Sequence, residues 1–534
     1  MNSHSLTIKV SIKQLLFFGI LLFAFMIRII GLGEVPAGVN QDEAMGAMDA
    51  WALSQYGTDR YGMQFPVHFT AWEYGQMSVL LSYCMIPFIK LFGFSAFAIR
   101  LPMVLISVMG VALMYLVSKK FFSVNMSLTV MAFAAINPWQ FMQSRWSLDC
   151  NLFPHVFLLA FYLLLCSFEK RRYLYLSMVF FGLTFYCYGI AIYTVPVFLF
   201  VYAAWCLWQK EFTFKEILIS VCIFFVVALP EILVMAINMF GLKTIHTPFI
   251  TIPYFPDSIR SNDILFLNFS LYQLGRNALS LLKQTFLQCP DYLFNTLPRF
   301  GTLYHVSTPF TFLGIIMFVK RFFTQKNKRQ KTLDLALCGY LIMGIWAGLI
   351  TFEVNVNRIN IIFYPLIFFT IYGTYCFVQF LPKAAIYLRN GFVVAYGILA
   401  ICFLGQYFTY FAENIQTMFN VDFLEVIKEA DNLEDYNTLY VSSNMGWQTN
   451  YKMAEILTQY ACQIDALYYQ EETNQTGGRQ LLPYSERYHF VDMAYQDTFD
   501  TEALYVLHKN DLHYMPADYE VIIASGEFMA IDLK

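Results

Sequence analysis

Apolar runs long enough to cross a membrane follow one another along the first three quarters of the chain. A helix needs about 20 mostly apolar residues to span the hydrocarbon layer, which is roughly 30 Å thick. Eleven runs fit, approximately at 14–32, 98–118, 124–142, 153–168, 173–188, 190–208, 216–238, 304–319, 332–350, 359–380 and 391–411. A further run, 76–92, is a borderline case. The pattern predicts a polytopic α-helical membrane protein.

The positions of lysine and arginine predict the orientation of these helices. Loops on the cytoplasmic side of a membrane carry an excess of both residues. If residues 1–13 are cytoplasmic, the loops on that side hold 17 such cations in about 50 residues, against nine in about 150 on the other side. Counting 76–92 as a crossing would move basic clusters outside, so we expect this run to lie along the outer interface. The prediction is about eleven crossings with a cytoplasmic N-terminus.

The segment after the last apolar run differs in charge and in periodicity. Residues 1–411 carry 28 Lys and Arg against 16 Asp and Glu, whereas 412–534 carry six against 21. Short strands are predicted at 438–443, 464–469, 488–492, 503–507 and 520–525, and a helix at 450–461. We expect 412–534 to be an acidic extracytoplasmic α/β domain beside a transmembrane catalytic domain at 1–411. The negative charge argues against a nucleic-acid partner.

Composition narrows the class further. The chain is 58% hydrophobic and 13% charged, with a mean hydropathy of +0.52, which excludes a soluble enzyme. Its 11 cysteines include no C-x-x-C pair, so neither a zinc site nor a disulfide framework is indicated. No Walker loop and no Rossmann glycine fingerprint is present, so nothing in the sequence indicates ATP or a nucleotide sugar.

Two outer loops, 33–97 and 239–303, are long enough to carry chemistry. Apolar residues at helical spacing in the first loop predict an amphipathic helix on the membrane surface, with Asn40 as N-cap and Glu43 in a capping-box-like position. Asp42 then lies in the first turn, close to the bilayer edge. The alternative is that the helix dipole alone favours acidic residues in the first turn.

Other ionisable residues are expected near the same face. Asp149 follows Arg145 in a short outer loop and could converge with Asp42, although a plain Arg145–Asp149 salt bridge is the alternative. Glu231 lies near the outer end of the seventh run and His305 at the start of the eighth. Ordinary interfacial residues remain the alternative for both.

The order of these motifs resembles a known family. Arg28 precedes P-x-G-x-x-x-D-E at 36–43, which leads into a surface helix ending in Gly57, and LFGFSAFAIRLP (91–102) and SRWSLDCNLF (144–153) follow. This succession resembles the polyprenyl-phosphate-sugar glycosyltransferases of the GT-C fold, in the group of protein O-mannosyltransferases and the aminoarabinose transferase of lipid A. The resemblance covers roughly residues 14–210 by motif and extends to about 411 by topology.

The resemblance implies a role for each matching position. Asp42 matches the family's catalytic base or acceptor-orienting acid, Glu43 completes the Asp-Glu pair, and Asp149 matches the second acid of the same cavity. Arg100 matches the arginine of the R-L-P element, and Arg358 resembles the arginine before a late helix. Many bacterial relatives also carry Lys-Pro-Pro before the segment that corresponds to 76–92, whereas this chain has Glu73 and no lysine there.

Sugar transfer from a lipid phosphate needs a base, cations for the departing phosphate and shielding from water. Asp42 is the predicted base, with inversion at the anomeric carbon, and Arg100, Arg358 and Arg145 are the predicted donor-phosphate ligands. The reserve cations of the second long loop are Lys243, Arg260, Arg276, Lys283 and Arg299. Ordinary attraction to anionic lipid heads is the alternative for these reserves.

The sequence therefore predicts a multi-pass glycosyltransferase at the outer face of the plasma membrane. Its predicted partners are membrane lipids, a polyprenyl-phosphate sugar donor, and a glycolipid, polymer or protein acceptor. No cofactor is required by the sequence, although Asp42 and Asp149 could hold a divalent cation. The alternative function is a membrane transporter or lipid flippase, but the acids gather at outer helix ends rather than at mid-bilayer.

Overall fold

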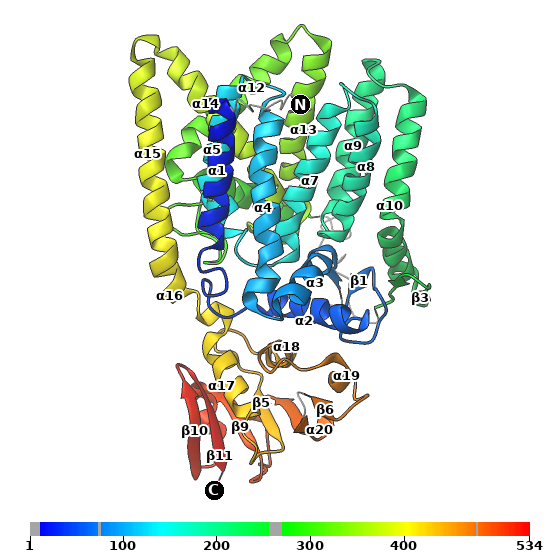
Figure 1. Ribbon diagram of the computed structural model, residues 1–534, viewed down its shortest axis with the longest axis vertical. Helices are drawn as coiled ribbons and strands as arrows, with labels where there is room; N and C mark the ends of the chain where they lie inside the picture. The colour runs from blue at the N-terminus through cyan, green and yellow to red at the C-terminus, as the bar shows by residue number, and fades with distance from the viewer. Residues whose placement is uncertain (1–10, 73–75, 256–269, 477–478, 534) are drawn as a thin grey trace, which may run out of the picture.

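Helices make up the first four fifths of the chain, and a small sheet domain follows them (Figure 1). The computed structural model describes residues 11–72, 76–255, 270–476 and 479–533. Glu73 and Arg260, which the sequence singles out, lie outside the described residues. The expected helical membrane fold with a small C-terminal domain of mixed structure is confirmed.

The long helices stand side by side in one bundle (Figure 1). They are α1 (Ile12–Ile29), α4 (Ala96–Ser118), α5 (Val124–Ile136), α7 (Asp149–Cys166), α8 (Arg172–Leu183), α9 (Ala191–Trp208), α10 (Phe214–Phe240), α12 (Thr308–Thr324), α13 (Lys328–Ile350), α14 (Phe363–Phe380) and α15 (Ala385–Gln406). Among the described residues, nine helical segments are long and apolar enough to cross a membrane; α5 and α8, with 13 and 12 residues, are shorter. The count of eleven crossings stays a prediction.

Two expected spans differ from the observed helices at the end where catalysis was expected. The run 124–142 is broken, because the Asn137 side chain accepts from the Gln140 amide and starts a separate short helix, α6 (Pro138–Met142). The run expected to begin at 153 begins at Asp149 instead. Both differences arise because polar residues start these helices, and a search for apolar runs does not take such residues into account.

Glycines let two bundle helices approach closely. A Cβ built on Gly314 of α12 would lie 1.9 Å from the Phe369 carbonyl oxygen, and one on Gly373 of α14 would lie 1.8 Å from that of Phe310. Small residues at such crossings bring the backbones of membrane helices together and increase van der Waals contact.

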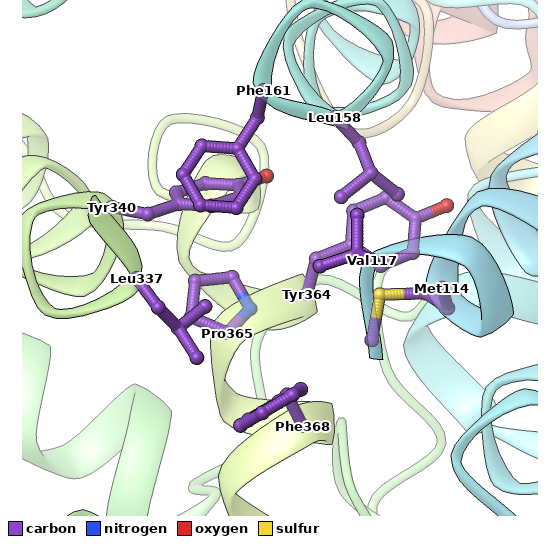
Figure 2. A pocket seen from close by; sticks show the side chains of 9 residues that line it. All are labelled: Met114, Val117, Leu158, Phe161, Leu337, Tyr340, Tyr364, Pro365 and Phe368. Carbon is purple, nitrogen blue, oxygen red and sulfur yellow. The ribbon is translucent and has the colours of Figure 1, made fainter. Parts of the chain in front are cut away.

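The bundle centre is a packed core. A cavity of about 10 Å³ lies among α4, α7, α13 and α14, and this volume is barely that of one water molecule. Figure 2 shows its lining: Met114, Val117, Leu158, Phe161, Leu337, Tyr340, Tyr364, Pro365 and Phe368.

Short elements cover one end of the bundle, which we call the α2 end (Figure 1). Helices α2 (Gln41–Tyr56) and α3 (Leu80–Phe92) run across this end, and the interfacial position expected for 76–92 stays a prediction. The other short elements of the two long loops are β1 (His68–Phe69), β2 (Met77–Ser78), β3 (Ile245–His246), β4 (Thr251–Ile252) and α11 (Leu271–Leu282). Strand β1 pairs with β2, and β3 pairs with β4.

The C-terminal domain is a mixed five-stranded sheet with strand order β10-β11-β9-β5-β8. Its strands are β5 (Leu439–Ser442), β8 (Tyr488–Val491), β9 (Leu504–His508), β10 (Tyr519–Ser525) and β11 (Phe528–Leu533). Strand β5 lies parallel to β8 and β9, and the other pairs are antiparallel. Its helices are α17 (Val421–Asp431), α18 (Tyr451–Ala461), α19 (Ala466–Tyr469) and α20 (Tyr484–Arg487), with α16 (Ala412–Asn414) before them and the hairpin β6 (Gln475–Thr476)–β7 (Arg479–Gln480) between α19 and α20.

Most of the predicted elements of this domain are present, and one is wrong. The segment 464–469 is not a strand, because Asp465 caps helix α19 by accepting from the Leu467 amide. Helix α17 and strand β11 were not predicted.

Helix α2 is not an open surface helix, contrary to the amphipathic prediction. It packs between the bundle end and α18 of the C-terminal domain (Figure 1). The Tyr56 hydroxyl donates to Asp465 Oδ2 at 2.7 Å, and the Gln470 amide donates to the Arg60 carbonyl at 3.0 Å. Both helix ends are as predicted, with Asn40 accepting from the Asp42 amide and Gly57 in the left-handed region at φ 74°. Contacts on both sides explain why most residues of the helix are buried.

The glycine contact between α12 and α14 predicts that Gly373→Ala destabilises the bundle. The new methyl group meets a backbone oxygen that cannot turn away, and overpacking of this kind costs about 1–3 kcal/mol. Gly397→Ala on α15 is the matched control, because nothing lies within 4 Å of a Cβ there. Thermal unfolding in detergent should show a lower Tm for Gly373→Ala only. Equal Tm values for both variants would contradict the close approach.

Candidate active site at the α2 end

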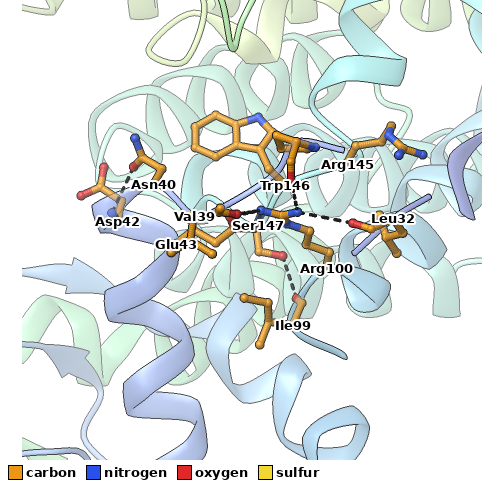
Figure 3. Close-up of polar contacts among 12 residues, drawn as sticks. Leu32, Val39, Asn40, Asp42, Glu43, Ile99, Arg100, Arg145, Trp146 and Ser147 are labelled. Carbon is orange, nitrogen blue, oxygen red and sulfur yellow. Dashed lines mark hydrogen bonds and ion pairs between the residues drawn. The ribbon is translucent and has the colours of Figure 1, made fainter. Parts of the chain in front are cut away.

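A buried ion pair fastens the first turn of α2 to the bundle. Arg100 donates from Nε to Glu43 Oε1 at 2.8 Å and from Nη2 to Oε2 at 2.7 Å, and both side chains are 0% exposed. Glu43 Oε1 also accepts from the backbone amide of Ser147 at 2.8 Å (Figure 3). Glu43 therefore does not complete the expected capping box, because its carboxylate is directed to α4 and to the loop before α7.

Two arginines bind the carbonyl groups of the segment that leads into α2. Arg100 donates to the carbonyl oxygens of Pro36 at 2.7 Å and Gly38 at 2.8 Å. Arg145, also 0% exposed, donates to those of Arg28, Gly31 and Val35 and to the Tyr407 hydroxyl. Irregular backbone next to lipid needs such partners, because unpaired carbonyls are costly there. Direct phosphate contacts of both arginines stay predictions.

Asp42 is the carboxylate of this network that remains partly accessible. Trp72, from the first long loop, donates its indole N–H to Asp42 Oδ1 at 2.6 Å. The neighbouring Glu43 is locked in the ion pair, so the backbone that carries Asp42 is fixed. A half-buried carboxylate on a rigid backbone suits a base that must meet a substrate hydroxyl.

Asp149 lies at the same end and is linked to this network through the chain. It is the first residue of α7, two positions after Ser147, whose amide binds Glu43. The amide of Cys150 donates to Asp149 Oδ1 at 2.6 Å. The structure thus connects the Asp42 turn and the Asp149 turn through one carboxylate, and the convergence of the two acids in one cavity stays a prediction.

Arg358 lies in a loop that is fastened to the start of α7. The Asn360 side chain, two residues on, donates to the Cys150 carbonyl. Arg358 itself is partly exposed, and its Nη1 donates to the Glu353 carbonyl at 3.2 Å. Among the described residues, its guanidinium makes fewer hydrogen bonds than those of Arg100 and Arg145.

The remaining predicted residues lie outside this network. Glu231 of α10 is 1% exposed and binds His68 Nδ1 at 3.1 Å through both of its oxygens, so it joins the first loop to α10. His305 is exposed, and its Nε2 lies 3.0 Å from the Pro298 carbonyl oxygen. The catalytic and binding roles of both stay predictions.

Sequence reasoning missed two features. Trp72 and His68 are single residues in a long loop, and nothing in their spacing marks them as partners of Asp42 and Glu231. Among the described residues, no group of three or more His, Cys, Asp or Glu side chains is arranged to hold a metal ion.

Two more buried carboxylates lie where the first loop meets the C-terminal domain. Asp49 of α2 forms an ion pair with Arg60 at 3.0 Å, and Asp59 accepts from the amides of Tyr61 and Met63. Burial raises the pKa of Asp59 from 3.8 to about 7, with a further contribution from the negative charge of Asp49. A carboxyl group with a raised pKa stabilises the fold when protonated, and this stability falls as pH rises from about 4 to about 7.

Asp59→Asn should therefore flatten the pH dependence of stability. The wild-type Tm is expected to fall between pH 4 and pH 7, because over this range the Asp59 carboxyl is ionised in the unfolded chain but keeps its proton in the buried site. The amide cannot ionise, so the variant should lose part of that fall. Differential scanning fluorimetry in detergent measures both Tm values. A pH dependence as steep as that of the wild type would contradict the burial of this group.

Comparisons with known proteins agree with this architecture. The family of dolichyl-phosphate-mannose-protein mannosyltransferases matches residues 77–235. The structure of ArnT from Cupriavidus metallidurans in the apo state aligns with a TM-score of 0.58 at 11% identity, over 97% of this chain and 97% of ArnT. ArnT bound to undecaprenyl phosphate aligns with a TM-score of 0.56 at 12% identity, again over 97% of each chain.

No curated protein matches the sequence significantly. The family match runs from β2 through most of α10 and includes Arg100, Arg145 and Asp149. The structural matches extend over nearly the whole chain, including the C-terminal domain. The chain is thus a GT-C-fold protein similar to ArnT and to the dolichyl-phosphate-mannose-protein mannosyltransferases, which confirms the resemblance seen in its motifs.

Proposed function

We propose that this protein transfers a sugar from a polyprenyl-phosphate donor to a hydroxyl acceptor at the α2 end of the bundle. The observation that carries the proposal is Asp42, a partly accessible carboxylate beside the buried Glu43–Arg100 pair. The fold and the undecaprenyl phosphate bound to the similar ArnT support a lipid-phosphate donor.

The proposed reaction is a single displacement at the anomeric carbon. The acceptor hydroxyl oxygen attacks this carbon and gives its proton to Asp42, while the bond from the carbon to the phosphate oxygen breaks. The electron pair leaves with the phosphate, and the sugar is inverted. Asp149 lines the same region and orients the acceptor or the sugar. A divalent cation between Asp42 and Asp149 stays a prediction.

The arginines divide into two proposed roles. Arg358 is the best placed to bind the donor phosphate, because it is partly exposed and next to the start of α7. Arg100 and Arg145 act as positioning residues, because their guanidinium groups bind backbone carbonyls of residues 28–38. Guanidinium groups suit both tasks, since each presents several donors in one plane.

The proposed orientation follows from the lysine and arginine count. It places the α2 end and the C-terminal domain on the outer face of the plasma membrane, with the N-terminus in the cytoplasm. The acceptor is a hydroxyl group of a glycolipid, a polymer or a protein. Assays that supply one kind of acceptor at a time distinguish these alternatives.

Asp42→Asn should abolish transfer without unfolding the protein. Loss of a general base lowers rates by about 100- to 10,000-fold. The assay follows release of free polyprenyl phosphate from radiolabelled polyprenyl-phosphate sugars, with a membrane extract as acceptor and with or without EDTA. Asp59→Asn is the control, because it makes the same substitution at the same end of the bundle.

Equal release by wild type and Asp42→Asn would exclude Asp42 as the base and leave Asp149 to be tested. Absence of release from every donor, by a folded wild-type protein, would favour the transporter or flippase alternative. Loss of release in EDTA that returns with one divalent ion would support the cation.

Trp72→Phe should lower kcat with little change in the KM for the donor. The indole hydrogen bond positions Asp42, so its loss misaligns the base but leaves the phosphate contacts in place. Steady-state kinetics with the same donors measure both constants. A change confined to KM would show that Trp72 binds the donor instead.

A further inference from the structure

A second cavity lies at the α2 end, and its lining residues differ from those of the Asp42 network. Its volume is about 220 Å³, and it is lined by Pro298, Arg299, Gln406 and Tyr410. The loop before α12 forms one wall, and the end of α15 with the turn Tyr407–Phe411 forms the other. None of these four lining residues belongs to the hydrogen-bond network of Glu43, Arg100 and Arg145.

The wall that carries Arg299 is fixed on both sides. Pro298, on one side, lies with its carbonyl oxygen 3.0 Å from His305 Nε2. Phe300, on the other side, is buried and packs edge-on against Phe403 of α15 with ring centroids 5.5 Å apart. The Arg299 backbone is therefore held at the cavity although the side chain itself is exposed.

The cavity presents hydrogen-bond donors and one positive charge. Arg299 has five N–H donors, Gln406 an amide and Tyr410 a hydroxyl. Within the part of the chain that the structure describes, Arg299 has no ion-pair partner. A guanidinium with neighbouring neutral donors binds phosphate oxygens well, and the site is large enough for such a group.

The helices next to the cavity walls, α12 and α15, carry exposed apolar side chains. Ile398 and Ile401 of α15 are 55% and 73% exposed, and Phe312 and Ile316 of α12 are 43% and 62% exposed. The two helices are joined by the hydrogen bond of 2.9 Å between the hydroxyls of Ser307 and Tyr396. Both helices belong to candidate membrane spans, so a lipid whose head lies in the cavity can extend its chains along them.

We propose that this cavity binds the phosphate of a membrane lipid, with Arg299 as its charged ligand. The shared chemistry is a phosphate ester on an apolar chain, which a glycerophospholipid and a polyprenyl phosphate both supply. The site is independent of the proposed transfer reaction, because it uses neither Asp42 nor Arg358.

The test counts bound lipids by native mass spectrometry on delipidated, full-length protein in neutral detergent. Three probes are titrated separately: phosphatidylglycerol, undecaprenyl phosphate and inorganic phosphate. Arg299→Gln should weaken binding of one lipid molecule by at least about tenfold, which is the loss of one charge-assisted contact of about 1.4 kcal/mol. Arg299→Lys should restore part of it.

Arg276→Gln is the matched control, because Arg276 is an exposed arginine of the same long loop that lies over the ring of Tyr272. It should bind lipid as the wild type does. Arg358→Gln separates the two proposals: it should remove only the donor-site molecule, and Arg299→Gln only the second one. If Arg299→Gln weakens the binding of only one of the two lipids, that lipid is the ligand.

Equal binding of both lipids by Arg299→Gln and Arg276→Gln would overturn the proposal. Binding of inorganic phosphate as tight as that of the lipids would overturn the lipid part of it, because the apolar chains would then contribute nothing.

Discussion

A carboxylate and a guanidinium group enclosed together, those of Glu43 and Arg100, determine how the α2 end is built. Isolating either charge from water costs several kcal/mol, so the pair is stable only when every donor and acceptor is used. Arg100 meets this condition with two bonds to Glu43 and others to Pro36 and Gly38, and Glu43 with the amide of Ser147. Three separate segments are thereby fixed to one another. Every proposed role of Asp42 and Asp149 depends on this arrangement.

The same constraint explains why arginine, and not lysine, occupies positions 100 and 145. The segment between α1 and α2 has irregular backbone, and its carbonyls cannot pair within a helix. Arg145 binds two of these carbonyls and that of Arg28 at the end of α1, and Arg100 binds a further group of them, so each planar guanidinium replaces several missing backbone hydrogen bonds. Side chains of the bundle therefore hold the backbone of this segment in place, which a site for a precise displacement requires.

Local signals made part of this structure readable from the sequence. Apolar length predicted the bundle helices, and Asn40 and Gly57 marked both ends of α2, because caps depend on neighbouring residues. The partner of Glu43 was misassigned, since a residue 57 positions away outcompetes the local capping box. The Trp72 contact with Asp42 and the docking of α18 on α2 likewise join distant segments, and no periodicity encodes them. The residues themselves singled out Asp42 and Asp149, and the resemblance to a family added Arg100, whereas the geometry separated the accessible acid from the buried pair.

The sandwich of α2 between the bundle and the C-terminal domain links the site to the order of synthesis. The hydrogen bond of Tyr56 cannot form until Asp465, a residue 409 positions later, has been synthesised. At roughly 5–20 residues per second, a ribosome needs about 20–80 s to supply it. During that interval the helix that carries Asp42 has only part of its bundle contacts, and its other face lacks the C-terminal domain. A nascent chain therefore completes the surroundings of its proposed base only when translation is nearly finished, and products that terminate before α18 lack one wall of them.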